Sequence, residues 1–275
     1  MQRENKTFWQ EKAEILVREY SQITDGFSVE KYRMQLVSEI LKKRSFVSSL
    51  LDIGCGPGTF LGLCGFVENK LGIDFSEAMI AFAKKQYPDI AFDIVSIEEY
   101  VTDVKYNAIT ALSVLPYIKD EKSVYNKIHG LLKDDGLFIA SYPNSLFNMF
   151  TDNELTYNFM EKIFYNYLTN KEFRKEELKN ISLDEKAIFQ EWSARDKIFV
   201  REENPLSIHL KLRSFDFNII NIIYLNIHPL KPKNMRKFKI DNSHSLYKDL
   251  QETLKEDWRS AFLASTFMVV ATKIA

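Results

Sequence analysis

Glycine is distributed very unevenly along this chain of 275 residues. Six of the nine glycines lie between Gly54 and Gly72, and none follows Gly136. Glycine is required where the backbone takes a positive φ or lies close against another group. We therefore expect one short loop near residue 54 to carry the unusual backbone of the chain.

Apolar runs that predict buried strands alternate with segments that predict helices. Strands are predicted for residues 49–53, 70–75, 90–95, 106–115, 137–143, 217–227 and 265–274. Helices are predicted for residues 8–44 with a break at Asp25-Gly26, from about Thr59, and for 76–87, 123–133, 205–213 and 244–258. Such alternation is typical of βαβ units. The predicted fold class is α/β, a doubly wound, mostly parallel seven-stranded sheet with helices on both faces.

The βα alternation stops after Asn144, where a segment rich in aromatic and mixed charged residues begins. We interpret residues 145–204 as a helical cap inserted into one domain. The remaining parts are an N-terminal helical segment (1–44), an α/β core (45–144) and a C-terminal part of the core sheet (205–275). A turn is expected at Asp134-Asp135-Gly136.

Composition excludes several classes of protein. Hydrophobic residues make up 45% and charged residues 27%, which excludes a disordered chain, and the net charge of −1 argues against a nucleic-acid-binding protein. Two cysteines, Cys55 and Cys64, predict neither a disulfide framework nor a zinc site, so we expect a reduced, cytoplasmic setting. No carboxylate–histidine cluster indicates a metal. The charged N-terminus lacks the apolar centre of a signal peptide, and no apolar run approaches a membrane span.

The glycine-rich segment 51–59, LDIGCGPGT, follows a predicted strand and precedes a predicted helix. Doubly wound sheets bind nucleotide-like ligands at this crossover, and the helix N-terminus offers N–H groups to an anion. Asp74 ends the second predicted strand, twenty residues after Gly54. A carboxylate at that place can accept hydrogen bonds from both hydroxyls of a ribose.

The glycine spacing argues against a dinucleotide site, because the third glycine of G-x-G-x-x-G would fall at Thr59 and stands instead at Gly58. With Asp52 upstream, the loop resembles motif I of the class I S-adenosylmethionine-dependent methyltransferases. LGIDFSEAMIAFAK, YNAITALSVLPYI and LLKDDGLFIASYPN resemble later motifs of that family. The resemblance covers most of residues 45–144 and resumes near 206–274.

The resemblance implies S-adenosylmethionine as the cofactor and S-adenosylhomocysteine as its product. The cofactor-binding residues that it implies are Tyr20, Asp52, Gly54, Cys55, Gly56, Gly58, Asp74, Phe75, Met79, Ser96, Ile97, Leu112 and Ser113. Ser96 stands where the family often has an aspartate for the adenine amino group. Asp216 stands where many members have glycine, and aspartate tolerates the left-handed conformation that glycine would supply.

Transfer of a methyl group to oxygen needs a general base, and the carboxyl ends of the strands are where this fold binds ligands. His228 and Tyr142 end predicted strands on that side and are the candidate catalytic residues. The alternative for His228 is a surface or satisfied histidine, and the alternative for Tyr142 is a packed aromatic ring with a bonded hydroxyl. The cations Lys231, Lys233, Arg236, Lys237 and Lys239 follow His228 with no acid among them. They indicate either a site for an anionic acceptor, bearing a phosphate or a carboxylate, or a solvated loop.

The leading hypothesis is therefore a methyltransferase that acts on an oxygen or nitrogen of a small, anionic metabolite. The aromatic insertion favours a small acceptor, because a polymer would need an open face. A methyltransferase for protein or RNA is one alternative. A catalytically silent regulatory protein that binds S-adenosylmethionine is the other. The oligomeric state stays open.

Overall fold

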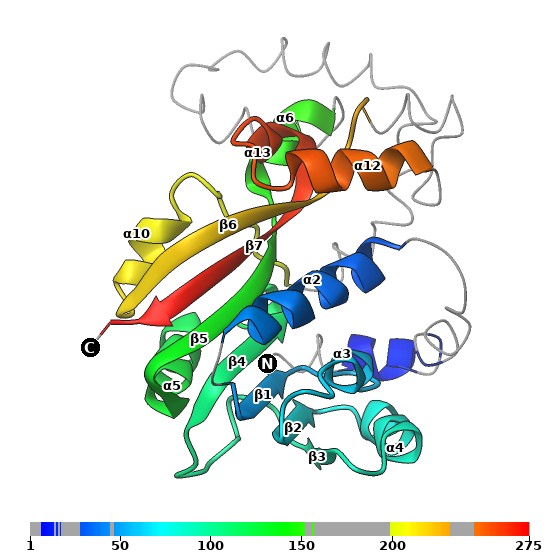
Figure 1. Cartoon of the computed structure of the whole chain (residues 1–275), viewed down its shortest axis with the longest axis vertical. Coiled ribbons are helices and arrows are strands. Elements are labelled where there is room, and N and C mark those ends of the chain that lie inside the picture. The colour runs from blue at the N-terminus through cyan, green and yellow to red at the C-terminus, as the bar shows by residue number, and fades with distance from the viewer. Residues whose placement is uncertain are drawn as a thin grey trace.

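The computed structural model describes residues 7–13, 15, 17, 28–44, 47–151, 156, 199–231 and 245–274. Its centre is a seven-stranded sheet (Figure 1). The strands are β1 (Ser49–Ile53), β2 (Asn69–Asp74), β3 (Ala91–Ile94), β4 (Tyr106–Leu112), β5 (Leu132–Pro143), β6 (Phe217–Ile227) and β7 (Ala264–Lys273). The main helices are α2 (Val29–Lys43), α3 (Thr59–Leu63), α4 (Glu77–Gln86), α5 (Glu121–Leu131), α10 (Ile208–Arg213) and α12 (Ser245–Leu254). Shorter elements are η1 (Leu115–Tyr117), η2 (Ser145–Phe147), α6 (Asn148–Thr151) and α13 (Ser260–Leu263).

The strands lie in the order β3-β2-β1-β4-β5-β7-β6. Strands β1 to β5 are parallel to one another, whereas β7 is antiparallel to both of its neighbours, β5 and β6. The predicted doubly wound, mostly parallel sheet is thereby confirmed. The chain runs outward in opposite directions from β1 and β4, so the crevice at their carboxyl ends is where such sheets bind ligands.

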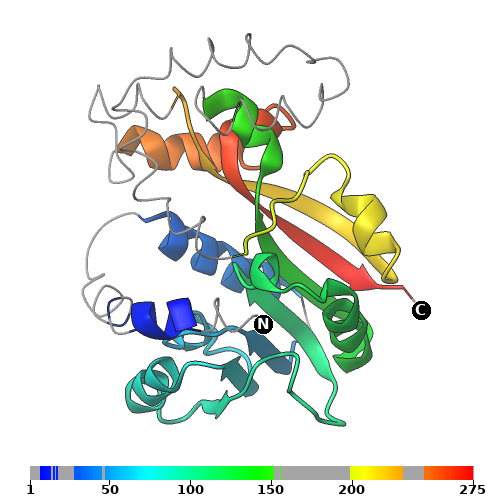
Figure 2. The same cartoon turned by 180° about the vertical axis from the view of Figure 1, so that it is seen from behind.

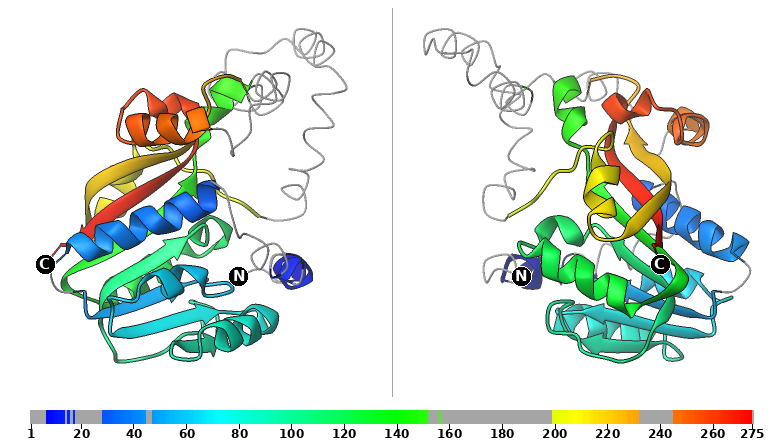
Figure 3. Two further views of the ribbon diagram at one scale, coloured as in Figure 1. Left: turned by 45° about the vertical axis from the view of Figure 1, so that its right-hand side comes forward. Right: turned by 90° about the vertical axis from the view of Figure 1, so that its left-hand side faces the viewer.

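Helices cover both faces of the sheet. Helices α5 and α10 lie on one face and α2 on the other, as the views in Figures 2 and 3 show. Alternate residues of one strand pack on the two faces of the sheet, because successive side chains of a strand point to opposite sides. Leu51 packs in the cluster that contains α5, and Leu50 packs in the cluster that contains α2.

Local sequence explains where helix α2 begins and ends. The Ser28 hydroxyl accepts a hydrogen bond from the backbone N–H of Lys31 at 3.1 Å and so caps the first turn. Glu30 lies in the first turn, and Lys42 and Lys43 lie in the last turn. This charge order complements the helix dipole.

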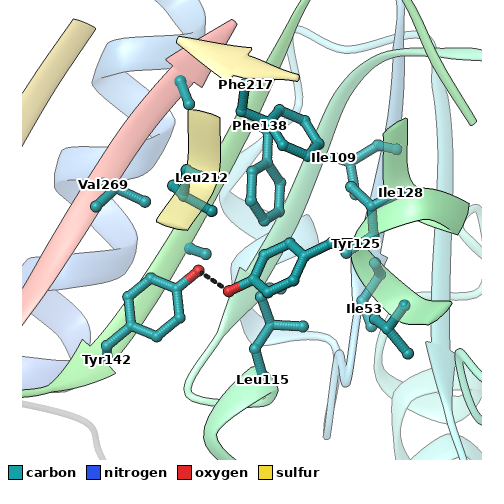
Figure 4. Packing of buried hydrophobic residues seen from close by; sticks show 14 of the residues in the cluster. Ile53, Ile109, Leu115, Tyr125, Ile128, Phe138, Tyr142, Leu212, Phe217 and Val269 are labelled. Atoms are coloured by element: carbon teal, nitrogen blue, oxygen red, sulfur yellow. Dashed lines mark hydrogen bonds between the residues drawn. The ribbon is translucent and has the colours of Figure 1, made fainter. Parts of the chain in front are cut away.

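A pair of buried tyrosines joins α5 to β5 at the centre of one sheet face. The Tyr125 and Tyr142 hydroxyls are 2.9 Å apart and form a hydrogen bond (Figure 4). Tyr125 also stacks on Phe215, with ring centroids 4.7 Å apart. Both tyrosines are 1% exposed, so each hydroxyl satisfies the other inside the core.

The predicted turn at Asp134-Asp135-Gly136 lies inside strand β5 as a bulge. The register moves from Leu132 opposite Tyr106 to Leu137 opposite Ala108, and Asp135 takes a φ of 59°. The expectation of a strand that begins at 137 was therefore wrong, because β5 begins at Leu132, which also pairs with β4. The left-handed conformation expected of Asp216 is confirmed by its φ of 59°.

The insertion between β5 and β6 is described at its two ends. It leaves β5 through η2 and α6, and residues 199–203 return beside the end of β5, where Asn144 forms a bridge with Glu203. Its central part, residues 152–155 and 157–198, lies outside the described residues, as does the expected helix break at Asp25-Gly26. Among the helices that are described, none has the length and apolar character needed to cross a bilayer.

Candidate functional site

A cavity of about 280 Å³ opens at the carboxyl ends of β1, β2 and β4. This is the crevice at which the strand order reverses. Eleven of the residues expected to bind the cofactor line it: Asp52, Gly54, Cys55, Gly56, Asp74, Phe75, Met79, Ser96, Ile97, Leu112 and Ser113. The fold therefore brings together residues spread over sixty positions of the sequence.

The glycine loop forms the floor of the cavity. Gly54, Gly56 and Gly58 have φ values of 65°, 51° and 76°, a region that residues with a side chain rarely adopt. A Cβ on Gly54 would lie 2.2 Å from Val114 Cγ2, so the chain passes too close there for any side chain. A Cβ on Gly56 would meet no atom of the described residues within 4 Å. Bare backbone at Gly56 thus faces open space, as a ligand cradle requires.

Asp74 ties the end of β2 to this loop. Its carboxylate accepts hydrogen bonds from the backbone N–H of Gly56 at 3.0 Å and from that of Ser76 at 2.9 Å. Burial raises the pKa of Asp74, while the two N–H groups act to lower it. A carboxylate offers about four lone-pair positions, so two further donors can still bind to Asp74.

Asp52 lies deeper, where β1 ends. It is 3% exposed and accepts a hydrogen bond from the Thr110 hydroxyl at 2.6 Å. Burial raises the pKa of Asp52 to about 7, with the charge of Asp74 acting in the same direction and Thr110 and Arg33 acting against it. A carboxyl group with this pKa changes charge near neutral pH.

Ser96 lies on a further wall of the cavity, after β3. Its hydroxyl donates to Glu99 Oε2 at 3.2 Å. A hydroxyl that donates its own proton to a carboxylate keeps its lone pairs for another donor. Ser96 can therefore accept a hydrogen bond from an amino group in the cavity.

Arg33 also lines the cavity, although the motifs did not point to it. Its Nη1 donates to the Ser113 hydroxyl at 2.6 Å and lies 3.4 Å from the Ser141 hydroxyl. Ser113 takes a φ of 62°, an uncommon conformation for a residue with a side chain. The buried Nε of Arg33 has no hydrogen-bond partner among the described residues. A guanidinium has five N–H donors, so donors other than those of Nη1 and the buried Nε can bind a carboxylate in the cavity.

A signal for Arg33 was present in the sequence. It lies four residues after Val29 and four before Val37, on the stripe of α2 that Leu41 continues. A charged residue on an otherwise buried helical stripe needs a partner in the interior. The partner itself, Ser113, stands eighty positions away and could not be identified from spacing.

The N-terminal helical segment reaches the cavity through Trp9. Its ring packs edge-to-face against Tyr117, with ring centroids 5.1 Å apart. Both residues line the cavity, and neither was expected there. Tyr20, which was expected to cover the cofactor from this segment, lies outside the described residues.

Three other expected site residues do not line the cavity. Gly58 caps α3, and a Cβ there would lie 2.7 Å from Phe92. Tyr142 bonds to Tyr125 in the core. The ring of His228 lies 4.7 Å from that of Phe147, and burial lowers the pKa of His228 to about 4. The structure thus places both candidate bases in packed surroundings and does not bring them to the cavity.

The basic segment after His228 is described only at Lys231, and its other four cations lie outside the described residues. Within the described parts of the chain, no group of three or more His, Cys, Asp or Glu side chains is arranged to hold a metal ion.

Comparison with known proteins agrees with the geometry of the cavity. A family model described as a methyltransferase domain matches residues 47–199, which is more than half of the chain. A trans-aconitate 2-methyltransferase from Methylobacterium radiotolerans is 28% identical over 99 residues, 35% of this chain and 38% of that protein. A malonyl-[acyl-carrier protein] O-methyltransferase from Ilyobacter polytropus is 28% identical over 141 residues, 46% of this chain and 53% of that protein. The chain thus spans about half the length, or less, of these curated relatives.

Solved structures show the same fold. Magnesium protoporphyrin IX methyltransferase from Synechocystis PCC 6803 with bound S-adenosylhomocysteine superimposes with a TM-score of 0.55 at 12% identity, over 98% of this chain and 99% of that one. An S-adenosylmethionine-dependent methyltransferase from Mesorhizobium loti gives a TM-score of 0.52 at 16% identity, over 86% and 96% of the two chains. The glycine loop, the doubly wound sheet and the family match agree, and the chain belongs to the methyltransferase domain family.

Proposed function

We propose that this protein is an S-adenosylmethionine-dependent methyltransferase whose acceptor is an oxygen or nitrogen of a small, anionic metabolite. The observation that carries the proposal is the cavity in which the bare backbone at Gly56, the Asp74 carboxylate and the Arg33 guanidinium meet. Each of them suits a different part of the cofactor. The family match and the methyltransferase relatives support the same activity.

Asp74 is placed to accept hydrogen bonds from the ribose hydroxyls, since it has lone pairs left after binding Gly56 and Ser76. Ser96 and Ile97 lie on the wall assigned to adenine. Arg33 suits the methionine carboxylate, because its guanidinium lines the cavity and has N–H donors beyond those that Nη1 directs to Ser113 and Ser141.

The charges of the cavity favour a cationic ligand. Three carboxyl side chains, Asp52, Asp74 and Glu98, line it together with Arg33. When bound, S-adenosylmethionine supplies a methyl group on a positively charged sulfonium sulfur, which is neutral after transfer. Negative charge on these side chains, where they are ionised, therefore stabilises the cofactor more than the product, which helps the product to leave.

The chain's part in the transfer is alignment of the acceptor and exclusion of water. Trp9 and Tyr117 form an aromatic edge of the cavity and shield it from solvent. Ser113, held in its uncommon conformation between Arg33 and Ser141, lies at the end of β4 where it can orient an acceptor.

The proposal that the acceptor is anionic is supported by observations other than the geometry of the cavity. Two relatives are named for trans-aconitate, which is a carboxylate, and for malonyl-[acyl-carrier protein], whose malonyl group has a carboxylate. In this chain the basic segment 231–239 follows β6, whose carboxyl end lies on the ligand side of the sheet. An acceptor carboxylate or phosphate would pair with those cations.

Two measurements test the proposal. Calorimetry should show binding of S-adenosylmethionine and S-adenosylhomocysteine, and tighter binding of NAD would overturn the cofactor assignment. Incubation with methyl-labelled S-adenosylmethionine and a metabolite extract should label small acids. Label in protein or RNA alone would favour a macromolecular acceptor, and no label at all would favour a silent cofactor-binding protein.

Charge-reversal variants test the assignment of the acceptor separately. Charge reversal at Lys233 and Arg236 should raise the apparent KM for the acceptor and leave the affinity for S-adenosylhomocysteine unchanged. Charge reversal at Lys84 and Lys85, in the last turn of α4, is the matched control. Equal KM values for the two double variants would show that segment 231–239 does not bind the acceptor.

A further inference from the structure

Lys127, on helix α5, makes an unusual set of contacts for a lysine. Its Nζ donates to three backbone carbonyls, those of Ile97 at 3.0 Å, Glu98 at 2.6 Å and Tyr100 at 3.0 Å. An ammonium group has three N–H donors, so these three carbonyls use its full capacity. The side chain is partly buried and is therefore only partly open to competing water.

The three carbonyls belong to one helical turn. The backbone N–H groups of Glu99 and Tyr100 both donate to the carbonyl of Ser96, at 3.1 and 2.9 Å. A single turn leaves its later carbonyls without partners inside the turn, as at any helix C-terminus. A cation is the favoured partner for such carbonyls. Lys127, on helix α5, therefore caps the free carbonyls of this turn.

The same turn forms a wall of the cavity. Ser96, Ile97 and Glu98 line the cavity, whereas no residue of α5 does so in the described part of the chain. The wall is tied to the sheet at its start, where Val95 N–H donates to the carbonyl of Asp74 at 3.0 Å. The Lys127 ammonium group holds the other end of this turn through the carbonyl of Tyr100.

We infer that Lys127 is a positioning residue for cofactor binding, which acts by holding the turn 96–100 in the shape that contacts adenine. The inference rests on the proposed placement of adenine beside Ser96 and Ile97. Without the ammonium group, the turn 96–100 would be less ordered in the free protein and would have to become ordered when the cofactor binds. The entropy of ordering it would then reduce the affinity.

The test compares two lysines of one helix. Lys127→Met keeps the length of the side chain and removes the three donors. Lys122→Met makes the same change of charge at an exposed position of α5. By calorimetry, Lys127→Met should weaken S-adenosylhomocysteine binding roughly tenfold, and Lys122→Met should leave it unchanged. Hydrogen exchange of a peptide that spans residues 95–101 should become faster in Lys127→Met alone.

An adenine-specific measurement separates positioning from a general loss of structure. S-inosylhomocysteine has a carbonyl oxygen in place of the amino group of adenine and a proton on N1, so it reverses the hydrogen-bonding pattern of that edge and leaves the rest of the ligand unchanged. The preference for S-adenosylhomocysteine over this analogue should shrink in Lys127→Met. An equal loss for both ligands, or unchanged affinity for both, would overturn the inference.

Lys127→Arg covers the case in which Lys127→Met does not fold. Arginine keeps the charge, but its planar fork cannot reproduce three donors from one atom, so the affinity should lie between those of Lys127→Met and the parent. Parental affinity together with parental exchange in Lys127→Arg would support a pure charge effect and overturn the geometric inference. Asp74→Ala tests the underlying site separately, since unchanged affinity in that variant would place the failure in the cofactor assignment.

Discussion

The Asp74 carboxylate accepts a hydrogen bond from the backbone N–H of Gly56 at 3.0 Å. This bond joins the end of β2 to the middle of the glycine loop, eighteen positions earlier in the chain. Gly56 can present its N–H in this way because it takes a φ of 51°. The acid and the glycine loop of the motif are therefore one connected structure.

Asp74→Ala should weaken the binding of S-adenosylhomocysteine by more than tenfold. It removes a charged acceptor for two ribose hydroxyls, and each such hydrogen bond contributes about 1.5–3 kcal/mol. Calorimetry measures the loss, with Asp93→Ala on the exposed side of β3 as control. Equal affinities of the two variants would exclude Asp74 from the ribose site.

Gly54→Ala should lower the free energy of unfolding by at least about 2 kcal/mol. The left-handed conformation alone costs a residue with a side chain about 1–2 kcal/mol, and the added Cβ would collide with Val114. Gly65→Ala is the matched control, because a Cβ there would meet no atom of the described residues within 4 Å, and it should change stability by less than about 0.5 kcal/mol. Urea denaturation compares them. Similar midpoints would mean that the loop relaxes freely around Gly54.

Tyr142→Phe should destabilise the protein by about 1–3 kcal/mol, because it leaves the buried Tyr125 hydroxyl without its partner. Tyr125→Phe together with Tyr142→Phe should cost less than the sum of the two single changes, since the double variant leaves no orphaned hydroxyl. S-adenosylhomocysteine affinity should stay at the parental value. A large loss of methyl transfer with parental stability would instead support the catalytic role expected for Tyr142.

His228 should make folding stability depend on pH between about 4 and 6.5. Burial lowers its pKa to about 4 in the folded state from 6.5, so the unfolded chain binds the additional proton in this range. The contribution of His228 is therefore complete above pH 6.5 and is lost as the pH falls, by at most about 3 kcal/mol. Asp52, with a pKa raised to about 7, acts in the opposite direction.

His228→Gln isolates this effect, because the variant keeps Asp52. Thermal unfolding of parent and variant should converge as the pH is lowered from 7 to 4. Parallel curves over that range would show that the pKa of His228 is the same in the folded and the unfolded protein, and His228 would again be a candidate base.

Local patterns were sufficient to predict much of the fold and part of the site. The glycine loop, the strand before it and the helix after it are neighbours in sequence, and period-two and period-3.6 patterns predict strands and helices from nearby residues. The position of Asp74 could be predicted for the same reason, because Gly54 follows the first strand and Asp74 ends the second strand of one βαβ unit. The start of β5 at Leu132 was missed because Leu132 pairs with Tyr106, a residue of another strand.

Only the tertiary structure decided which side chains from distant parts of the chain line the cavity or hold its walls. Arg33 meets Ser113 across eighty positions, Trp9 meets Tyr117, and Lys127 reaches back to the turn after β3. It also placed Tyr142 in the core rather than in the cavity, because the Tyr125 hydroxyl on another element satisfies it. The sequence by itself determined the sheet and the glycine loop, because these depend on conformational preferences of neighbouring residues. The remaining contacts depend on how helices pack against the sheet, and that packing is a property of the whole chain.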